Sequence, residues 1–284
     1  MSLNIYQIIT DRIIDELNKG LIPWRKPWKS AGRPVNYITQ KPYNGINLLL
    51  LPYSGEWATF KQIKDCGGKV KAGSKSSMIV FFKMLDKKDD TDKDEEESKK
   101  IPFLRYSNVF HIGTQTEGLE SKIKPVIGSN DINPIEEAEK ALNDYINRSG
   151  VNFEAVNGSN EAFYSISNDK IVVPHMIQYT NVNEYYSVIY HEAGHSTGHK
   201  SRLDRLDKNA SFDSQTYSKE ELIAEIASCM TLNILGLEIP ETFENSIAYI
   251  QNWKQKLIDD NKIILQSANQ AQKAVNMILN IEAE

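Results

Sequence analysis

Apolar residues in the first half of the chain change their spacing several times, and each spacing predicts a different element. From Asn4 to Lys19 they recur every three to four positions, which predicts an amphipathic helix that stops at Gly20. Thr59 is suited to cap a short helix that runs through Cys66. Two later stretches have the pattern of strands, residues 69–83 with a turn at 73–75 and residues 101–112. We therefore expect the first half to form an α/β unit.

The second half begins with a clear helix start, at Asn133 as N-cap and Pro134 as first helical residue. Three short apolar runs then predict a small antiparallel sheet, at 153–156, 162–167 and 170–173. We expect the strand 170–173 to be the sheet edge along which an extended peptide lies. Helical periodicity returns over three segments, about 183–199, 218–235 and most of 240–284. The pattern as a whole predicts an α+β fold class with two domains, 1–124 and 125–284.

Charge is distributed unevenly along the chain, although the formal net charge is only −5. Residues 1–85 hold 13 Lys and Arg against 5 Asp and Glu, a net of +8, and residues 86–97 hold 8 acidic against 3 basic groups, a net of −5. The remainder is therefore −8. The charged run 86–100 has no apolar face, which indicates a solvated hairpin loop. A basic half followed by an acidic half suggests two modules with different partners.

Several features favour a cytoplasmic protein that does not enter a membrane. No apolar run approaches the roughly 20 residues that a membrane-spanning helix needs. The start of the chain lacks the basic flank and apolar core of a secretory signal. Cys66 and Cys229 lie far apart and form no disulfide framework, so we interpret both as buried small apolar residues in a reducing compartment. The oligomeric state is left open by the sequence.

The segment His191-Glu192-Ala193-Gly194-His195 carries the clearest chemistry. A helix places residues four apart on one face, so His191 and His195 can present two imidazoles to one cation. Glu192 lies beside that face, where its carboxylate can take a proton from metal-bound water. Gly194 is costly inside a helix and indicates close packing at that point. This predicts a zinc site with Glu192 as the catalytic base, and another divalent metal can take the place of zinc.

A third protein ligand is expected from a helix that packs against this one, because catalytic zinc has three protein ligands and an open position. Residues 220–228 offer Glu221 and Glu225 on one face, with small residues that allow close approach. We favour Glu221 as the ligand and Glu225 as a carboxylate behind a ligand histidine. The alternative is that Ser218 and Glu221 form a capping box, which leaves Glu225 as the ligand. His199 is expected at the helix end and His175 away from the site.

The basic first half also interleaves aromatic with cationic residues. The aromatic residues are Trp24, Trp28, Tyr37, Tyr43, Tyr53 and Trp57, and the cations among them are Arg25, Lys26, Lys29, Arg33 and Lys41. Such pairing suits single-stranded nucleic acid, because cations neutralise phosphates while rings stack on bases. The alternative is that the aromatic residues build a small core, and composition does not decide between the two.

These motifs together resemble one known family, the antirestriction proteins of the ArdC type. In the first half the resemblance rests on Pro23-Trp24, Pro27-Trp28, Arg33-Pro34, Tyr43-Asn44-Gly45-Ile46-Asn47, Trp57, Thr59-Phe60 and residues 115–119. In the second half it rests on residues 190–199, 201–205, 217–225 and Trp253. The match covers nearly the whole chain, and the acidic run 86–97 departs from the family pattern.

The resemblance implies an N-terminal domain that binds single-stranded DNA and a C-terminal zincin-like metallopeptidase domain, in a protein carried by mobile elements. It implies a peptide or protein substrate of unknown identity. The residues that we then predict to bind DNA are Trp24, Arg25, Lys26, Trp28, Lys29, Arg33, Tyr43 and Asn47. The competing hypothesis is a DNA-binding protector whose metal site only stabilises the fold.

Overall fold

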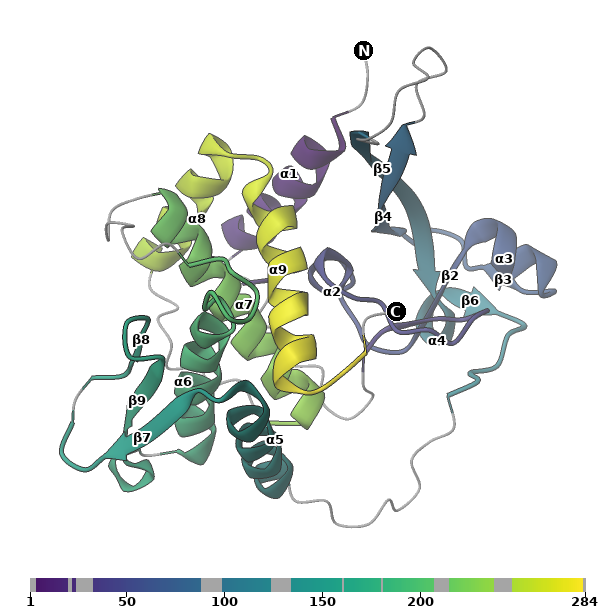
Figure 1. The fold of residues 1–284 in the computed structure, drawn as a ribbon. Coiled ribbons are helices and arrows are strands. Elements are labelled where there is room, and N and C mark those ends of the chain that lie inside the picture. The colour runs from purple at the N-terminus through teal and green to yellow at the C-terminus, as the bar shows by residue number, and fades with distance from the viewer. Residues whose placement is uncertain are drawn as a thin grey trace, which may run out of the picture.

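The computed structural model describes residues 4–19, 22–23, 33–87, 99–123, 134–159, 161–179, 181–206, 215–237 and 247–282. These residues form a mixed helix and sheet structure with two parts (Figure 1). The N-terminal part contains a four-stranded and a two-stranded sheet, and the C-terminal part contains a three-stranded sheet and the longest helices. None of the described helices is both long and apolar enough to cross a bilayer.

The four-stranded sheet has the order β1-β2-β5-β4. Its strands are β1 (Val35–Asn36), β2 (Glu56–Thr59), β4 (Ser77–Lys87) and β5 (Lys99–His111). Strands β4 and β5 form the predicted hairpin, with antiparallel pairing from Ser77↔Val109 to Lys87↔Lys99. The predicted acidic loop is therefore shorter than 86–100, because the strands extend into both of its ends. Residues 88–98 lie outside the described residues.

The N-terminal helices follow the sequence prediction closely. Helix α1 (Ile5–Asn18) begins at Asn4, whose side chain accepts a hydrogen bond from the Gln7 N–H. Helix α3 (Phe60–Asp65) begins with a capping box between Thr59 and Gln62. Cys66 ends α3 and is exposed, so the expectation that it is buried was wrong, whereas Cys229 is buried as expected. The remaining short elements are α2 (Ile46–Leu50), β3 (Lys69–Val70), α4 (Ile112–Gln115) and β6 (Thr116–Glu117).

The C-terminal sheet differs from the prediction in its strand order. Its strands are β7 (Asn152–Val156), β8 (Phe163–Ser165) and β9 (Lys170–Pro174), arranged β7-β9-β8. Strand β9 pairs parallel with β7 and antiparallel with β8, so the sheet is mixed and not purely antiparallel. The last strand inserts between the first two, an order that apolar periodicity does not encode. Strand β9 is consequently central, and the expectation that 170–173 forms an edge was wrong.

Five longer helices complete the C-terminal part, and a 3₁₀ turn, η2 (Met176–Gln178), precedes the second of them. They are α5 (Pro134–Ser149), α6 (Val182–Ser196), α7 (Gln215–Leu235), α8 (Ile247–Asp259) and α9 (Ile263–Ile278). The predicted N-cap of α5, Asn133, lies outside the described residues. Figure 1 shows α9 between α7 and the N-terminal helix α2.

One hydrophobic cluster connects the two predicted domains. It contains Ile9, Ile13 and Leu17 from α1, together with residues of α2, β4 and the C-terminal helices α7, α8 and α9. Polar contacts cross the same junction, since the Thr10 hydroxyl donates to the Asn261 carbonyl at 2.9 Å and the Gly45 N–H donates to Gln272 at 3.0 Å. Burial of this apolar surface stabilises both parts at once. The boundary near residue 124 stays a prediction.

Candidate metal centre

Helix α6 is fixed by one face and carries the histidine motif on another. Asn181 caps its start by accepting from the Asn183 N–H. Tyr186 and Tyr190 are buried, and their hydroxyls donate to the Glu139 carboxylate at 2.9 Å and the Ala138 carbonyl at 2.7 Å of α5. With these side chains anchored, one turn of α6 brings the Nε2 atoms of His191 and His195 to 3.2 Å from each other.

Helix α7 lies against this turn because both helices have small residues at the contact. A Cβ atom added at Gly194 would lie 3.1 Å from the Ala224 Cα and 3.4 Å from the Ala224 Cβ. A side chain at position 194 would contact Ala224 more tightly than an ordinary van der Waals contact, so glycine suits this approach of the two backbones. Helix α7 begins at Gln215, so Ser218 lies inside the helix and the capping-box alternative for Ser218 and Glu221 was wrong.

The close approach places the Glu221 carboxylate across both imidazoles. Its Oε2 atom is 3.5 Å from His191 Nε2, and its Oε1 atom is 3.4 Å from His195 Nε2. Among the described residues these three form the group whose ligand atoms all lie within 4.8 Å of one another. Two atoms bound at about 2.0–2.1 Å to one tetrahedral zinc lie about 3.3 Å apart, so the donor set fits such an ion.

Two further carboxylates lie behind the histidines, on the side away from this group. Glu225 Oε2 is 3.9 Å from His191 Nδ1, and Glu220 Oε1 is 3.6 Å from His195 Nδ1. His191 Nδ1 is buried without a hydrogen-bond partner among the described residues, and the Glu225 carboxylate lies beside it. Carboxylates in this position orient ligand histidines in metalloproteins. Glu225 lies where we expected a carboxylate behind a ligand histidine, a role that stays a prediction, and Glu220 was not among the residues expected here.

The electrostatics of the site favour positive charge. Burial alone would lower the pKa of His191, but the hydrogen bond to Glu221 and the charges of Glu192 and Glu225 raise it to about 9. A site that holds a proton this firmly attracts a cation in its place, because metal and proton compete for the same nitrogen. Glu192 itself is 8% exposed, directly after His191 on α6.

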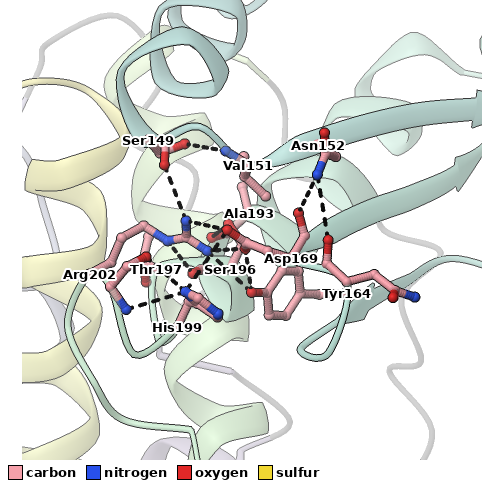
Figure 2. A network of polar contacts seen from close by, with 12 residues as sticks. Ser149, Val151, Asn152, Tyr164, Asp169, Ala193, Ser196, Thr197, His199 and Arg202 are labelled. Atoms are coloured by element: carbon pink, nitrogen blue, oxygen red, sulfur yellow. Dashed lines mark hydrogen bonds and ion pairs between the residues drawn. The ribbon is translucent and has the colours of Figure 1, made fainter.

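Two arginines in the turn that follows α6 connect this turn to α6 and to neighbouring elements. Figure 2 shows Arg202, which donates to the Ser196 carbonyl at 2.7 Å, to the Ser149 carbonyl at 3.3 Å and to both oxygens of Asp169. Arg205 donates to the Gly194 carbonyl at 3.0 Å and to Glu220 through two nitrogens. His199 lies in this turn, where its Nδ1 atom is hydrogen-bonded to the Ser201 hydroxyl. It is not part of the candidate ligand group found among the described residues. His175 is exposed and caps η2.

Few of the predicted DNA-binding residues can be placed. Trp24, Arg25, Lys26, Trp28 and Lys29 lie outside the described residues. Arg33 donates to the Asn44 side chain at 3.0 Å.

Two others have structural contacts. Tyr43 is 8% exposed, and burial raises the pKa of its hydroxyl. Asn47 holds β4 through its side-chain amide, whose nitrogen donates to the Val80 carbonyl at 2.9 Å and whose oxygen accepts from the Val80 N–H at 2.7 Å. Tyr37 and Trp57 are buried as well, whereas Tyr53 is exposed. For most of the described aromatics the small-core alternative is therefore the better description.

Comparisons with known proteins match one family model to each half of the chain. Residues 3–110 match the family described as the N-terminal domain of anti-restriction factor ArdC. Residues 140–270 match the family described as zincin-like metallopeptidase. Two crystal structures of the antirestriction ArdC protein from the R388 plasmid are similar over the whole chain, at 33% sequence identity. The metal-free structure has a TM-score of 0.74 with 97% of both chains covered, and the Mn(II)-bound structure has 0.75 with 98% of both covered.

Curated relatives include longer proteins. A DNA primase TraC of Escherichia coli is 33% identical over 298 residues, which include 98% of this chain but 20% of the primase. A second TraC primase of that organism is 31% identical, and the chain spans 27% of its length. An uncharacterized protein y4eC of Sinorhizobium fredii is 29% identical, with 95% of this chain and 90% of the relative covered.

Proposed function

The chain belongs to the ArdC family of antirestriction proteins, and on that basis we propose that it binds single-stranded DNA and hydrolyses a peptide bond at a divalent-metal centre. The observation that carries the enzymatic part is the convergence of His191, His195 and Glu221 on one point, 3.2–3.5 Å apart, beside the buried Glu192. The family fold supports a zincin-like site, and the Mn(II)-bound relative supports a divalent ion.

In this proposal His191, His195 and Glu221 hold the metal, with zinc as the preferred ion. A bound divalent ion supplies Lewis acidity, which polarises the scissile carbonyl and makes water acidic enough to react near neutral pH. A carboxylate oxygen of Glu192 accepts the proton of the attacking water and returns it to the leaving amine. Glu220 and Glu225 orient the two imidazoles from behind.

The arrangement favours catalysis over a purely structural metal. Structural zinc is closed by four protein ligands, whereas a catalytic ion keeps one position open. Among the described residues, the candidate ligand group has three members and not four. A water or a substrate carbonyl is therefore the natural fourth ligand.

An extended peptide substrate is best accommodated at β8. This strand is an edge of the three-stranded sheet and packs near α6, whereas β9 is paired on both sides. Edge strands offer unpaired backbone groups to which a peptide can add as a further strand. We therefore place the peptide along Phe163–Ser165, in place of the strand 170–173 expected from the sequence.

For DNA, the proposal uses the basic character of the first 85 residues and the similarity to primases, which act on nucleic acid as their names state. The residues proposed to contact the strand are Trp24, Arg25, Lys26, Trp28, Lys29 and Arg33. We leave out Tyr43, which is buried, and Asn47, whose amide is bonded to the Val80 backbone, whereas the contact of Arg33 with Asn44 is exposed. In this function the protein protects incoming DNA of a mobile element in the cytoplasm of the recipient cell.

The test is the isosteric variant Glu192→Gln, which keeps the three metal ligands and removes the base. We expect the variant to bind metal and single-stranded DNA like the unchanged protein, and to lose both peptide hydrolysis and protection of unmodified plasmid DNA in a restricting host. Protection that survives in Glu192→Gln would show that proteolysis is not its cause. The comparison then favours a protector that acts by binding DNA alone.

A further inference from the structure

The two arginines of the turn that follows α6 are matched in almost every respect. Both are nearly buried, with 5% of the Arg202 side chain and 8% of the Arg205 side chain exposed. Each donates to a backbone carbonyl near the end of α6, and each makes a two-pronged ion pair with one carboxylate. They differ in what that carboxylate contacts.

The partner of Arg205 is Glu220, which lies directly behind a proposed metal ligand. Arg205 Nη2 is 2.8 Å from Glu220 Oε1, and Arg205 Nε is 3.2 Å from Glu220 Oε2. The same Glu220 Oε1 lies 3.6 Å from His195 Nδ1. Arg205, Glu220 and His195 therefore form a continuous chain of polar contacts. Each of these side chains is at most 13% exposed.

The physical consequence is a fixed and charged acceptor behind the imidazole. A buried carboxylate without a cation tends to take up a proton, because burial penalises its charged form. Here two nitrogens of the Arg205 guanidinium donate to the two oxygens of Glu220, so a buried cation balances the charge of the carboxylate. An ionised carboxylate at Nδ1 keeps the proton of the ring on that nitrogen and leaves the lone pair of Nε2 for a metal.

Arg205 also joins the two helices that carry the ligands. Its Nη2 atom donates to the Gly194 carbonyl at 3.0 Å, and Nη1 donates to the Thr197 hydroxyl at 3.0 Å. Gly194 is the residue of α6 at which an added Cβ would lie 3.1 Å from the Ala224 Cα of α7. One guanidinium thus contacts α6 beside His195 and α7 beside Glu221.

The carboxylate partner of Arg202 is Asp169, whose contacts do not include the proposed metal ligands. Asp169 accepts from Arg202 and from the Tyr164 hydroxyl at 2.6 Å, and its nearest imidazole is that of His199, at 3.9 Å. Figure 2 shows that Arg202 and Asp169 connect the end of α6, the end of α5 and the turn that joins β8 to β9. Arg202 therefore provides a control of equal burial and equal charge.

We propose that Arg205 is a positioning residue of the metal centre, which acts through Glu220 on His195 and sets the affinity of the site for its metal. The inference rests on the proposed function of the same site. Arg205 touches neither substrate nor metal in this arrangement. Its effect is transmitted by the orientation and tautomer of one ligand.

The experiment measures zinc and Mn(II) dissociation constants by competition with a chromophoric chelator, using the full chain at constant pH. Loss of an outer carboxylate partner lowers metal affinity by about 10–100-fold in comparable sites. We expect Glu220→Gln and Arg205→Gln each to weaken binding within that range. The double variant Arg205→Gln/Glu220→Gln should be no weaker than Glu220→Gln, because the arginine acts through the glutamate. Arg202→Gln should lower the melting temperature of the metal-free protein and leave the dissociation constants unchanged.

Two further readouts separate positioning from stability. Arg205→Lys keeps the charge but loses the two-pronged geometry, so it should recover part of the affinity. Cobalt(II) bound in place of zinc should show a changed visible spectrum in Glu220→Gln and not in Arg202→Gln. If Arg205→Gln does not fold, Glu220→Gln and Arg205→Lys carry the test.

The outcomes distinguish this inference from the function on which it rests. If the unchanged protein binds no stoichiometric metal, the proposed function fails. If it binds metal and the Glu220 and Arg205 variants bind equally well, or if Arg202→Gln weakens binding as much as Arg205→Gln, only the positioning role is refuted.

Discussion

Gly194→Ala is the substitution whose effect on the metal centre follows most directly from the geometry. The added methyl group would lie 3.1 Å from the Ala224 Cα and 3.4 Å from the Ala224 carbonyl oxygen. A carbon–carbon contact is at its optimum near 3.5–4.0 Å, so the helices must separate by a few tenths of an ångström. Glu221 lies one turn before Ala224 on α7 and moves with it.

Two effects on stability oppose each other in this variant. Alanine in place of glycine favours the helix by about 1 kcal/mol. Overpacking a tight contact costs about 1–3 kcal/mol. We therefore expect the free energy of unfolding of the metal-free protein to fall by about 0–2 kcal/mol, the difference between these two ranges.

Metal binding should suffer more than stability. Metal–ligand distances tolerate about 0.2 Å, so a comparable shift of Glu221 away from His191 and His195 strains one bond. We expect the dissociation constant for zinc to rise by about tenfold or more, similar to the loss of an outer-shell partner. Chelator competition measures the affinity, and urea unfolding of the metal-free protein measures the stability. A variant that is about 1 kcal/mol more stable and binds zinc as tightly as the unchanged protein would refute the argument that close helix approach builds the site.

Three other predictions concern protonation, the N-terminal sheet and the shared core. Because the pKa of His191 is raised to about 9 from 6.5, its protonation stabilises the metal-free protein fully below pH 6.5, and this contribution is lost as pH rises through about 9. Thermal unfolding from pH 6 to 10 should show this loss of stability in the unchanged protein and not in His191→Gln. The affinity for zinc should rise over the same pH range. Asn47→Ala should lower the free energy of unfolding by about 1–3 kcal/mol, because it leaves the Val80 N–H and carbonyl without partners; an unchanged urea midpoint would contradict this. A fragment of residues 1–124 should show no cooperative thermal transition, because Ile9 and Ile13 lose the buried face supplied by the C-terminal helices; a sharp transition would instead support an independently folding domain.

Local sequence signals predicted most individual helices and strands. They did not predict how these elements are arranged relative to one another. Periodicity and capping identified α1 and α3 because these signals lie within a few residues of each element. The order β7-β9-β8 did not follow from periodicity, since the pairing of β9 on both sides depends on contacts across the chain. The start of α7 was placed too late because Ser218 has the sequence of an N-cap but lies inside the helix.

The candidate site shows the same division. Spacing alone placed His191 and His195 together, and small residues at the helix contact indicated a partner helix with Glu221. The position of Glu220 behind His195 was not predicted because Glu220 lies beside Glu221 in sequence, and only the placement of α7 decides which carboxylate faces which side of an imidazole. The ion pair with Arg205 depends on the path of the turn after α6, for which the sequence has no periodic signal.

The proposed function requires that His191, His195 and Glu221 hold one divalent metal ion. Elemental analysis of the purified full chain, after equilibration with zinc and removal of unbound ion, tests it most directly. We expect one ion per chain in the unchanged protein and in Glu192→Gln, and a loss of that ion in His191→Ala, His195→Ala and Glu221→Gln. Ion content that is absent throughout, or that persists when either histidine is replaced, would contradict it.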